Sequence, residues 1–376
     1  MPEIGVYQGS IGKQGSREQL HTPALLLDLE ALNRNAERMN SYLEGTSVKL
    51  RPHSKAHKCG VLGRLQMDWG AVGISCANLT EAEAMAEAGI PSILVTSPVV
   101  TATMLERLMA VASRIDELVV VVDHPQNVLD LSSAAKTRGV GIGALVDIDV
   151  GQHRTGVLGP KEAVELASAL RDSGIDYRGV QAYYGHLQHV STYTERVERV
   201  NEQVGRLEDV IEALEANDLK PQVISGGGTG TFHIDLENRV FTELQVGSYL
   251  FMDRQYAGIE LTPDNPRPFE HALFVQANVV SKNQPGLAVV NAGWKAFSTE
   301  DRTPQVHDGA PLDAEYRWMG DEHGGLQISD AAKPDLGSRV EFIPNHCDPT
   351  VNLYRSFHCI RGNTLVDLWT IDGNGY

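Results

Sequence analysis

The stretch AVGISCANLTEAEAMAEAGIPSILVTSPVVTATMLERLMAVASRIDELVVVVD, residues 71–123, alternates short apolar runs with longer amphipathic segments. The apolar runs are 71–76, 92–97 and 117–123, and the amphipathic segments are 80–88 and 101–113. Continuous apolar runs of this length are typical of strands buried on both faces of a parallel sheet. The amphipathic segments have helical spacing and open with capping residues such as Thr80 and Thr101. The stretch therefore predicts an α/β fold with right-handed crossovers.

The same alternation covers most of the first 250 residues. Further strands are predicted at 24–29, 48–52, 143–150, 177–184, 222–225 and 242–249, and further helices at 31–43, 125–137, 160–172 and 191–216. Together with the three apolar runs above, these are nine strands, whereas a (β/α)8 barrel needs eight, so one strand is spare. An open doubly wound sheet is the competing fold, but no GxGxxG follows the first strand.

The pattern of apolar and amphipathic segments changes after about residue 258. The segment TPDNPRPFE, residues 262–270, is a proline-rich connector, and short alternating strands follow it without helical periodicity. This pattern predicts an all-β second domain.

Composition excludes several classes of function. The 376 residues include 32 basic and 49 acidic side chains, a formal charge of −17, which disfavours nucleic-acid and anionic lipid partners. No apolar run reaches the length of a membrane span, and no signal peptide is expected at the N-terminus. The four cysteines form no CxxC pair, which is typical of a reducing, cytoplasmic setting.

Two motifs at predicted strand ends suggest a cofactor site. RPHSKAHK, residues 51–58, places Lys55 among other basic residues, and mutual repulsion would favour the neutral, nucleophilic amine. A basic surface loop explains this pattern equally well. SGGGTGTF, residues 225–232, has the successive glycines that let backbone N–H groups approach a phosphate, although a glycine-rich turn is the alternative.

NHCDPT, residues 345–350, is a candidate metal site. If it is a strand, His346 and Asp348 point to one side and Cys347 to the other. An imidazole and a carboxylate, completed by water, would favour Mn²⁺ or Mg²⁺ over Zn²⁺. For two ligands alone, a His–Asp hydrogen bond that closes a turn before Pro349 is the stronger interpretation.

Two more loops carry candidate polar groups. In YYGHLQH, residues 183–189, His186 and His189 are three apart, so they could share one helical face. Either is a candidate base, with a structural histidine as the alternative. In DIDVGQHRTGV, residues 147–157, Arg154 could hold a phenolate or carboxylate, or form a surface salt bridge.

These motifs occur together in one group of enzymes. The chain resembles the D-threonine aldolase and 3-hydroxy-D-aspartate aldolase family of alanine-racemase-like, fold type III pyridoxal-phosphate enzymes, from residue 21 to the C-terminus. The matching motifs are RPHSKAHKC, IDVGQHRTGV, SGGGTG, TELQVGSYLFMD, DEHG and HCDPT. The resemblance implies a pyridoxal 5'-phosphate (PLP) barrel over residues 30–258. It also implies a β domain made of 1–29 and 259–376, which accounts for the spare strand.

The resemblance also implies roles for individual residues. Lys55 would carry the cofactor, His189 is a candidate base beside the substrate hydroxyl, and His346 and Asp348 match the metal pair. Gln245 matches the position facing the pyridine nitrogen, where a neutral amide would not keep that nitrogen protonated as a carboxylate would. The other expected cofactor contacts are His53, Arg154 near the phenolic oxygen, Tyr183, Gly227, Gly228, Thr229, Gly247, Ser248 and Tyr256.

The implied reaction is metal-assisted retro-aldol cleavage of a D-3-hydroxy-α-amino acid to glycine and an aldehyde, carried out by a homodimer. A 3-hydroxy-D-aspartate aldolase, which gives glycine and glyoxylate, is one alternative. Others are a D-3-hydroxyamino acid dehydratase, whose metal strand tends to carry His-x-Cys, an amino-acid racemase and a PLP carrier protein. The chain departs from the family pattern at Ala77, Ser97, Pro98, Tyr184, His186 and Trp294, positions that are expected to line or support the substrate pocket.

Overall fold

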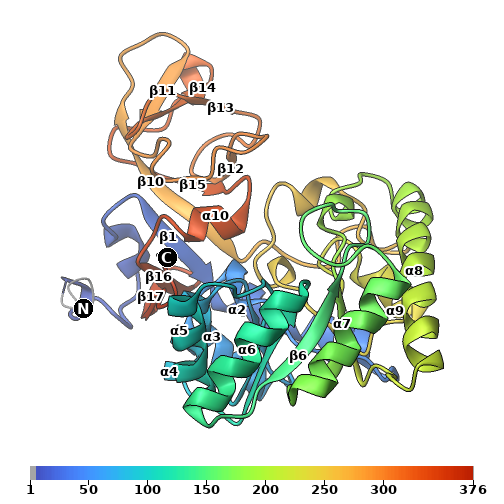
Figure 1. Ribbon diagram of the computed structural model, residues 1–376. Helices are drawn as coiled ribbons and strands as arrows, with labels where there is room; N and C mark the ends of the chain where they lie inside the picture. The colour runs from blue at the N-terminus through green and yellow to red at the C-terminus, as the bar shows by residue number, and fades with distance from the viewer. Residues whose placement is uncertain (1–5, 376) are drawn as a thin grey trace. The chain divides into compact units, whose positions relative to one another are not determined.

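A computed structural model describes residues 6–375, which form two compact units (Figure 1). The first unit contains the described residues up to Met39 together with 248–258 and 267–371. The second contains 40–247, 259–266 and the described residues from Asp372 onward.

The second unit is built on an eight-stranded parallel sheet. Its strands are β2 (Lys49–Leu50), β3 (Ile74–Cys76), β4 (Ser92–Val95), β5 (Glu117–Val122), β6 (Gly143–Ile148), β7 (Asp176–Ala182), β8 (Val223–Gly226) and β9 (Glu243–Leu244). They lie in the order β2-β9-β8-β7-β6-β5-β4-β3. A parallel bridge between His53 and Ser75 joins the two ends of the sheet, so it closes into a barrel. The predicted eight-stranded barrel is confirmed.

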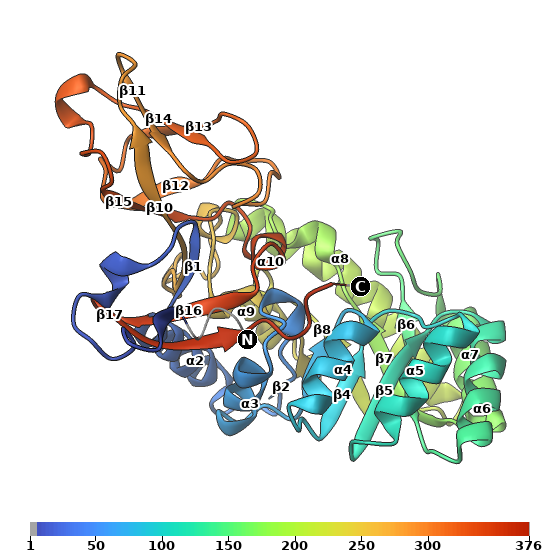
Figure 2. The ribbon, with the colours of Figure 1, turned by 90° about the vertical axis from the view of Figure 1, so that its left-hand side faces the viewer.

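Helices cover the outside of this barrel, as Figure 2 shows for α4 to α7. The α-helices whose bounds the structure describes between residues 24 and 240 are α2 (Leu29–Leu43), α3 (Gly60–Asp68), α4 (Leu79–Glu87), α5 (Ala102–Ala112), α6 (Pro125–Arg138), α7 (Pro160–Ser173), α8 (Tyr193–Ala216) and α9 (Phe232–Asn238). Thr101 caps α5 as predicted. Thr80 does not cap α4, because Asn78 accepts the Glu81 N–H at 3.0 Å and starts the helix earlier.

The first unit contains the second, mostly antiparallel sheet. Its strands are β1 (Ala24–Asp28), β10 (Leu273–Ser281), β11 (Leu287–Val290), β12 (Gln305–Asp308), β13 (Glu315–Trp318), β14 (Gly324–Gln327), β15 (Arg339–Ile343), β16 (Ser356–Arg361) and β17 (Thr364–Thr370). The early strand β1 lies between β10 and β16. A short helix, α10 (Cys347–Val351), follows β15.

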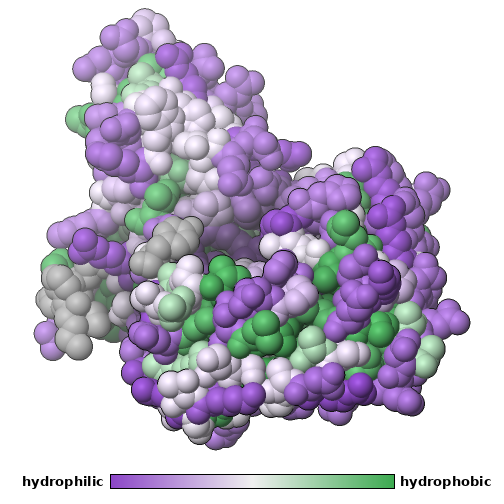
Figure 3. Space-filling model, viewed as in Figure 1, coloured by the Kyte–Doolittle hydropathy of each residue, from purple (hydrophilic) through white to green (hydrophobic). Residues whose placement is uncertain are grey.

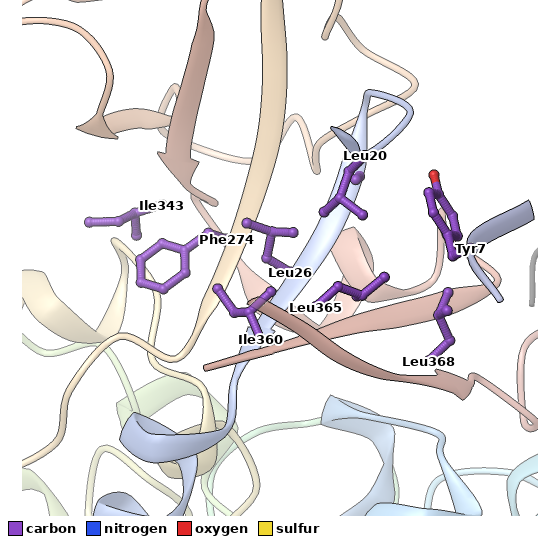
Figure 4. Packing of buried hydrophobic residues seen from close by; sticks show 9 residues of the cluster. Tyr7, Leu20, Leu26, Phe274, Ile343, Ile360, Leu365 and Leu368 are labelled. Atoms are coloured by element: carbon purple, nitrogen blue, oxygen red, sulfur yellow. The ribbon is translucent and has the colours of Figure 1, made fainter. Parts of the chain in front are cut away.

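An apolar cluster joins the early and late segments of this unit (Figure 4). Leu26 of β1 packs with Phe274 of β10 and Ile360 of β16, and all three side chains are almost fully buried. Burying side chains of this size stabilises the fold by roughly 1.5–3 kcal/mol each. The N-terminal strand is therefore fixed by residues that come more than 240 positions later in the chain.

Polar residues dominate the face shown in Figure 3, with apolar side chains exposed between them over the helical layer. Val100, Met104 and Leu129 are among the exposed apolar residues of the second unit. Among the described residues, no helix has the length and apolar character needed to cross a membrane.

Candidate active site

Lys55 lies directly after β2, in a short 3-10 helix over Ser54–Ala56. The His53 side chain caps this turn, since its Nδ1 accepts the Lys55 N–H at 3.3 Å, and its Nε2 lies 3.1 Å from Thr96 Oγ1. Ser54 Oγ donates to the buried Glu81 carboxylate at 3.0 Å. The backbone that presents Lys55 is thus held by a residue of α4, the helix after β3, and by Thr96 at the end of β4.

Two basic residues of this segment, Arg51 and His57, have partners outside the segment. Arg51 Nε forms an ion pair with Glu243 Oε1 at 2.8 Å, and its Nη1 donates to Ser92 Oγ at 2.8 Å. His57 Nε2 lies 3.1 Å from Gln66 Oε1. The buried Arg51 guanidinium needs a carboxylate partner, which Glu243 provides. The sequence alone did not show that Glu243 would be this partner.

Arg154 and Lys55 converge on the ring of Tyr183. Tyr183 follows β7, Arg154 lies in the loop after β6, and both are expected cofactor contacts. The Lys55 Nζ is 6.0 Å from the centroid of the Tyr183 ring, and the Arg154 Cζ is 5.6 Å from it. Three strand ends of the barrel therefore bring a nucleophile, a guanidinium and an aromatic ring together, which is where barrel enzymes hold their active sites.

The glycine loop after β8 is packed too closely for any side chain. A Cβ at Gly228 would lie 2.4 Å from Gln188 Oε1, and one at Gly230 would lie 2.0 Å from the Gln188 carbonyl oxygen. Gly227 has a φ of +69°, in the left-handed region that favours glycine. The loop leads straight into α9. These features suit a loop that holds a phosphate with its backbone.

A buried polar group supports this loop from behind. Asp235 of α9 accepts hydrogen bonds from the Tyr184 hydroxyl and, at 2.7 Å, from Thr231 Oγ1. Complete burial raises the pKa of Asp235 to about 7. Tyr184, one of the departures from the family pattern, is thus a partner of the loop's support and is fully buried.

The loop that carries His186 and His189 does not form the shared helical face suggested by their spacing. His186 lies in a 3-10 turn over Gly185–Leu187 and His189 in the turn after it, and both are exposed. The buried Arg196 of α8 donates hydrogen bonds to the carbonyl oxygens of Val190 and Glu260. This guanidinium fixes the end of the loop.

His346 and Asp348 lie at the start of α10, so the prediction of a strand there was wrong. β15 ends at Ile343, His346 is the residue before α10, and Asp348 lies in its first turn. Pro349 also lies in the first turn, where its missing N–H costs nothing. Cys347 does not point away from Asp348, because its buried thiol donates to Asp348 Oδ1 at 3.2 Å.

Several neighbours hold this pair. His346 Nδ1 lies 2.7 Å from Glu300 Oε2, which leaves Nε2 as the ring nitrogen for a metal. Ser248, expected from the resemblance to contact the cofactor, donates to Asp348 Oδ1 at 3.3 Å. The fully buried Asp253 accepts the N–H groups of Cys347 at 2.8 Å and Tyr256 at 2.9 Å. Neither Glu300 nor Asp253 was among the predicted site residues, although Asp253 is the last residue of the motif TELQVGSYLFMD.

This set of donors fits a metal that prefers oxygen and nitrogen. Burial raises the pKa of the Cys347 thiol well above its usual range, so sulfur stays protonated and is a poor ligand. Within residues 6–375 no cluster of three or more His, Cys, Asp or Glu side chains could hold a metal, so water would have to complete the coordination of His346 and Asp348.

Three departures from the family pattern line one cavity. Ala77, Ser97 and Pro98 lie at the carboxyl ends of β3 and β4, around a cavity of about 210 Å³ that also reaches Met104 of α5. Arg107 lines it as well, but its guanidinium is paired with Glu83 at 2.7 Å. Trp294, in the first unit, is 48 % exposed.

Comparison with known protein families shows which family the chain belongs to. Residues 27–255 match the family model described as alanine racemase, N-terminal domain. The chain belongs to this family. Residues 272–360 match a second model, the putative serine dehydratase domain. The alanine-racemase-like fold implies PLP as the cofactor, and Lys55, Arg154, Tyr183 and the glycine loop fit it.

Two curated relatives from this family cover almost the whole chain. The chain is 35 % identical to a 3-hydroxy-D-aspartate aldolase of Paracoccus denitrificans (strain Pd 1222), over 95 % of this chain and 93 % of the relative. It is 36 % identical to a D-threonine aldolase of Arthrobacter sp., over 95 % and 94 %. The solved D-threonine aldolase from Filomicrobium marinum is 39 % identical, with a TM-score of 0.90 over 94 % of this chain and 96 % of that one. The predicted resemblance is confirmed.

Proposed function

We propose that the chain is a PLP- and divalent-metal-dependent aldolase that cleaves D-3-hydroxy-α-amino acids to glycine and an aldehyde. The convergence of Lys55 and Arg154 on the Tyr183 ring, next to a loop whose glycines leave no room for a side chain, is the observation that supports the cofactor site. The similarity to D-threonine and 3-hydroxy-D-aspartate aldolases supports the reaction.

When bound, PLP would supply an electron sink for the carbanion left by cleavage of the Cα–Cβ bond. In this proposal Lys55 binds the cofactor, and Arg154, Tyr183 and His53 orient it. Gly227, Gly228, Thr229, Gly247, Ser248 and Tyr256 complete the expected contacts. His189 accepts the proton of the substrate β-hydroxyl, for which its exposed position after β7 gives access.

His346 and Asp348 would hold Mn²⁺ or Mg²⁺, and the bound ion would supply a Lewis acid for the β-hydroxyl. The Glu300 carboxylate on His346 Nδ1 supports this assignment, since metal-binding histidines commonly use their second nitrogen in this way. The homodimer implied by the resemblance belongs to the same proposal and is tested by light scattering of the purified protein.

Elimination of water is the competing reaction, because residues 272–360 match a putative serine dehydratase domain. Both reactions start from the same substrates, so the products distinguish them.

The purified protein, supplied with PLP and Mn²⁺, is given D-threonine, D-3-hydroxyaspartate and their L-enantiomers. The proposal expects glycine and an aldehyde from the D-substrates only, lost when EDTA removes the metal. Formation of 2-oxobutanoate or oxaloacetate with ammonia would identify a dehydratase instead.

A further inference from the structure

A layer of polar side chains crosses the barrel at the carboxyl ends of its strands. Asp147 of β6, Gln181 of β7 and Ser225 of β8 are register partners on neighbouring strands. Gln245 follows β9 and is held beside them, since its backbone N–H donates to the Gly226 carbonyl at 2.8 Å. All four side chains are buried.

Two acceptors fix the direction of the Gln181 amide. Its Nε2 donates to Asp147 Oδ1 at 2.9 Å and to the Thr96 carbonyl oxygen at 3.3 Å. A carbonyl and a carboxylate can only accept, so a flipped amide would place its oxygen against two oxygens. Gln181 Oε1 must therefore face the other way, toward Gln245.

The direction of the Gln245 amide follows from that of Gln181. Gln245 Nε2 donates to Gln181 Oε1 at 3.1 Å and to Ser225 Oγ at 2.9 Å, so both amide hydrogens are used. Gln245 Oε1 has no hydrogen-bond partner among residues 6–375. Asp147 and Gln181 were not among the expected site residues. Together they determine that Oε1 is the end of the Gln245 amide that remains available.

We infer that Asp147 and Gln181 lock Gln245 so that only its Oε1 acceptor is left for the ring nitrogen of bound PLP, and that this contact holds a proton there. This inference rests on the proposed function, which assigns Gln245 to the ring nitrogen. An acceptor favours the protonated form of the group it faces, whereas an amide N–H would favour the neutral form. From the residue type alone, a neutral amide was not expected to keep this nitrogen protonated, and the fixed direction of the Gln245 acceptor changes that expectation.

The locked amide suits the proposed reaction. A protonated ring withdraws electrons more strongly, which favours cleavage that leaves a carbanion. Asp147 and Gln181 are positioning residues here, because they act through Gln245. Thr155 Oγ1 donates to Asp147 Oδ2 at 2.7 Å, and Arg154 and Asp123 are the charged side chains whose fields reach this carboxylate. Burial raises the pKa of Asp147 to about 6. Well above that pH the Asp147 carboxylate is ionised, so both acceptors of the Gln181 amide, Asp147 and the Thr96 carbonyl oxygen, are present.

The test uses the holoenzyme reconstituted with PLP labelled with ¹⁵N in the ring, and the ¹⁵N shift is followed by NMR as pH is varied. We expect Gln181→Met, which frees the Gln245 amide, to lower the proton affinity of the ring nitrogen about tenfold. Gln245→Glu, a permanent acceptor, should raise it above wild type. Gln276→Met replaces a buried glutamine of β10 in the other unit and should leave it unchanged.

Equal titration of wild type and Gln181→Met, or weaker proton binding in wild type, overturns the inference. If Gln181→Met does not fold, Gln245→Leu against wild type decides the same question, because it removes the acceptor directly. Failure of the proposed function appears separately, as a protein that binds no PLP or that releases no aldehyde from D-substrates.

Discussion

Replacing Glu300 by Gln should weaken metal binding without unfolding the site. The Glu300 carboxylate lies 2.7 Å from His346 Nδ1, with side chains 55 % and 21 % exposed. Outer partners of this kind contribute roughly 10- to 100-fold to metal affinity. Because Glu300 is more than half exposed and therefore screened by water, we expect the lower limit, about tenfold or ~1.4 kcal/mol. The backbone should stay in place, since Asn345 Nδ2 donates to the Glu300 carbonyl at 2.7 Å.

The dissociation constant of Mn²⁺ is measured by electron paramagnetic resonance of the free ion, in wild type, Glu300→Gln and Asp301→Asn. Asp301 is the matched control, because it is exposed, adjacent and loses the same charge, while its Oδ2 contacts Gln255 at 3.4 Å and not His346. An unchanged constant in Glu300→Gln, or an equal loss in Asp301→Asn, would refute the orienting role.

Three further predictions concern the metal, the phosphate loop and stability. Asp348→Ala should abolish aldehyde formation while leaving the visible absorbance of bound PLP intact; loss of absorbance as well would show a structural role. Gly230→Ala should weaken PLP binding at least tenfold in equilibrium dialysis, because its Cβ would meet the backbone carbonyl oxygen of Gln188 at 2.0 Å. The pKa of Asp235 is raised to about 7 in the folded protein, so folding binds a proton and stability should fall as pH rises toward 7, by at most ~1.4 kcal/mol per pH unit. Asp235→Asn should flatten this slope in urea unfolding, and an unchanged slope would count against the assignment.

The barrel could be predicted because its strands are buried on both faces. Runs such as LVVVV at 118–122 have no other simple interpretation, and the eight barrel strands are observed where these runs were predicted. Helices with clear periodicity and caps were also predicted to within a few residues. The short helices α3 and α9 were not, because α3 contains two glycines, Gly60 and Gly63, which disfavour a helix, and α9 has only seven residues.

The site was predicted only in part. Lys55 and the glycine loop stand out because their residue types are unusual at strand ends. The strand assigned to His346 and Asp348 failed because Pro349 fits the first turn of a helix but cannot donate a hydrogen bond within a sheet. The direction of the Gln245 amide depends on Asp147 and Gln181, which meet it only across neighbouring strands of the closed barrel.

The central claim is that Lys55 holds PLP at the strand ends of the barrel. The purified protein, loaded with PLP, is treated with borohydride, digested and analysed by mass spectrometry. The account predicts a single pyridoxyl-phosphate adduct on the peptide that contains Lys55, absent from Lys55→Ala. An adduct on another lysine, or none on a protein that still cleaves D-threonine, would contradict it.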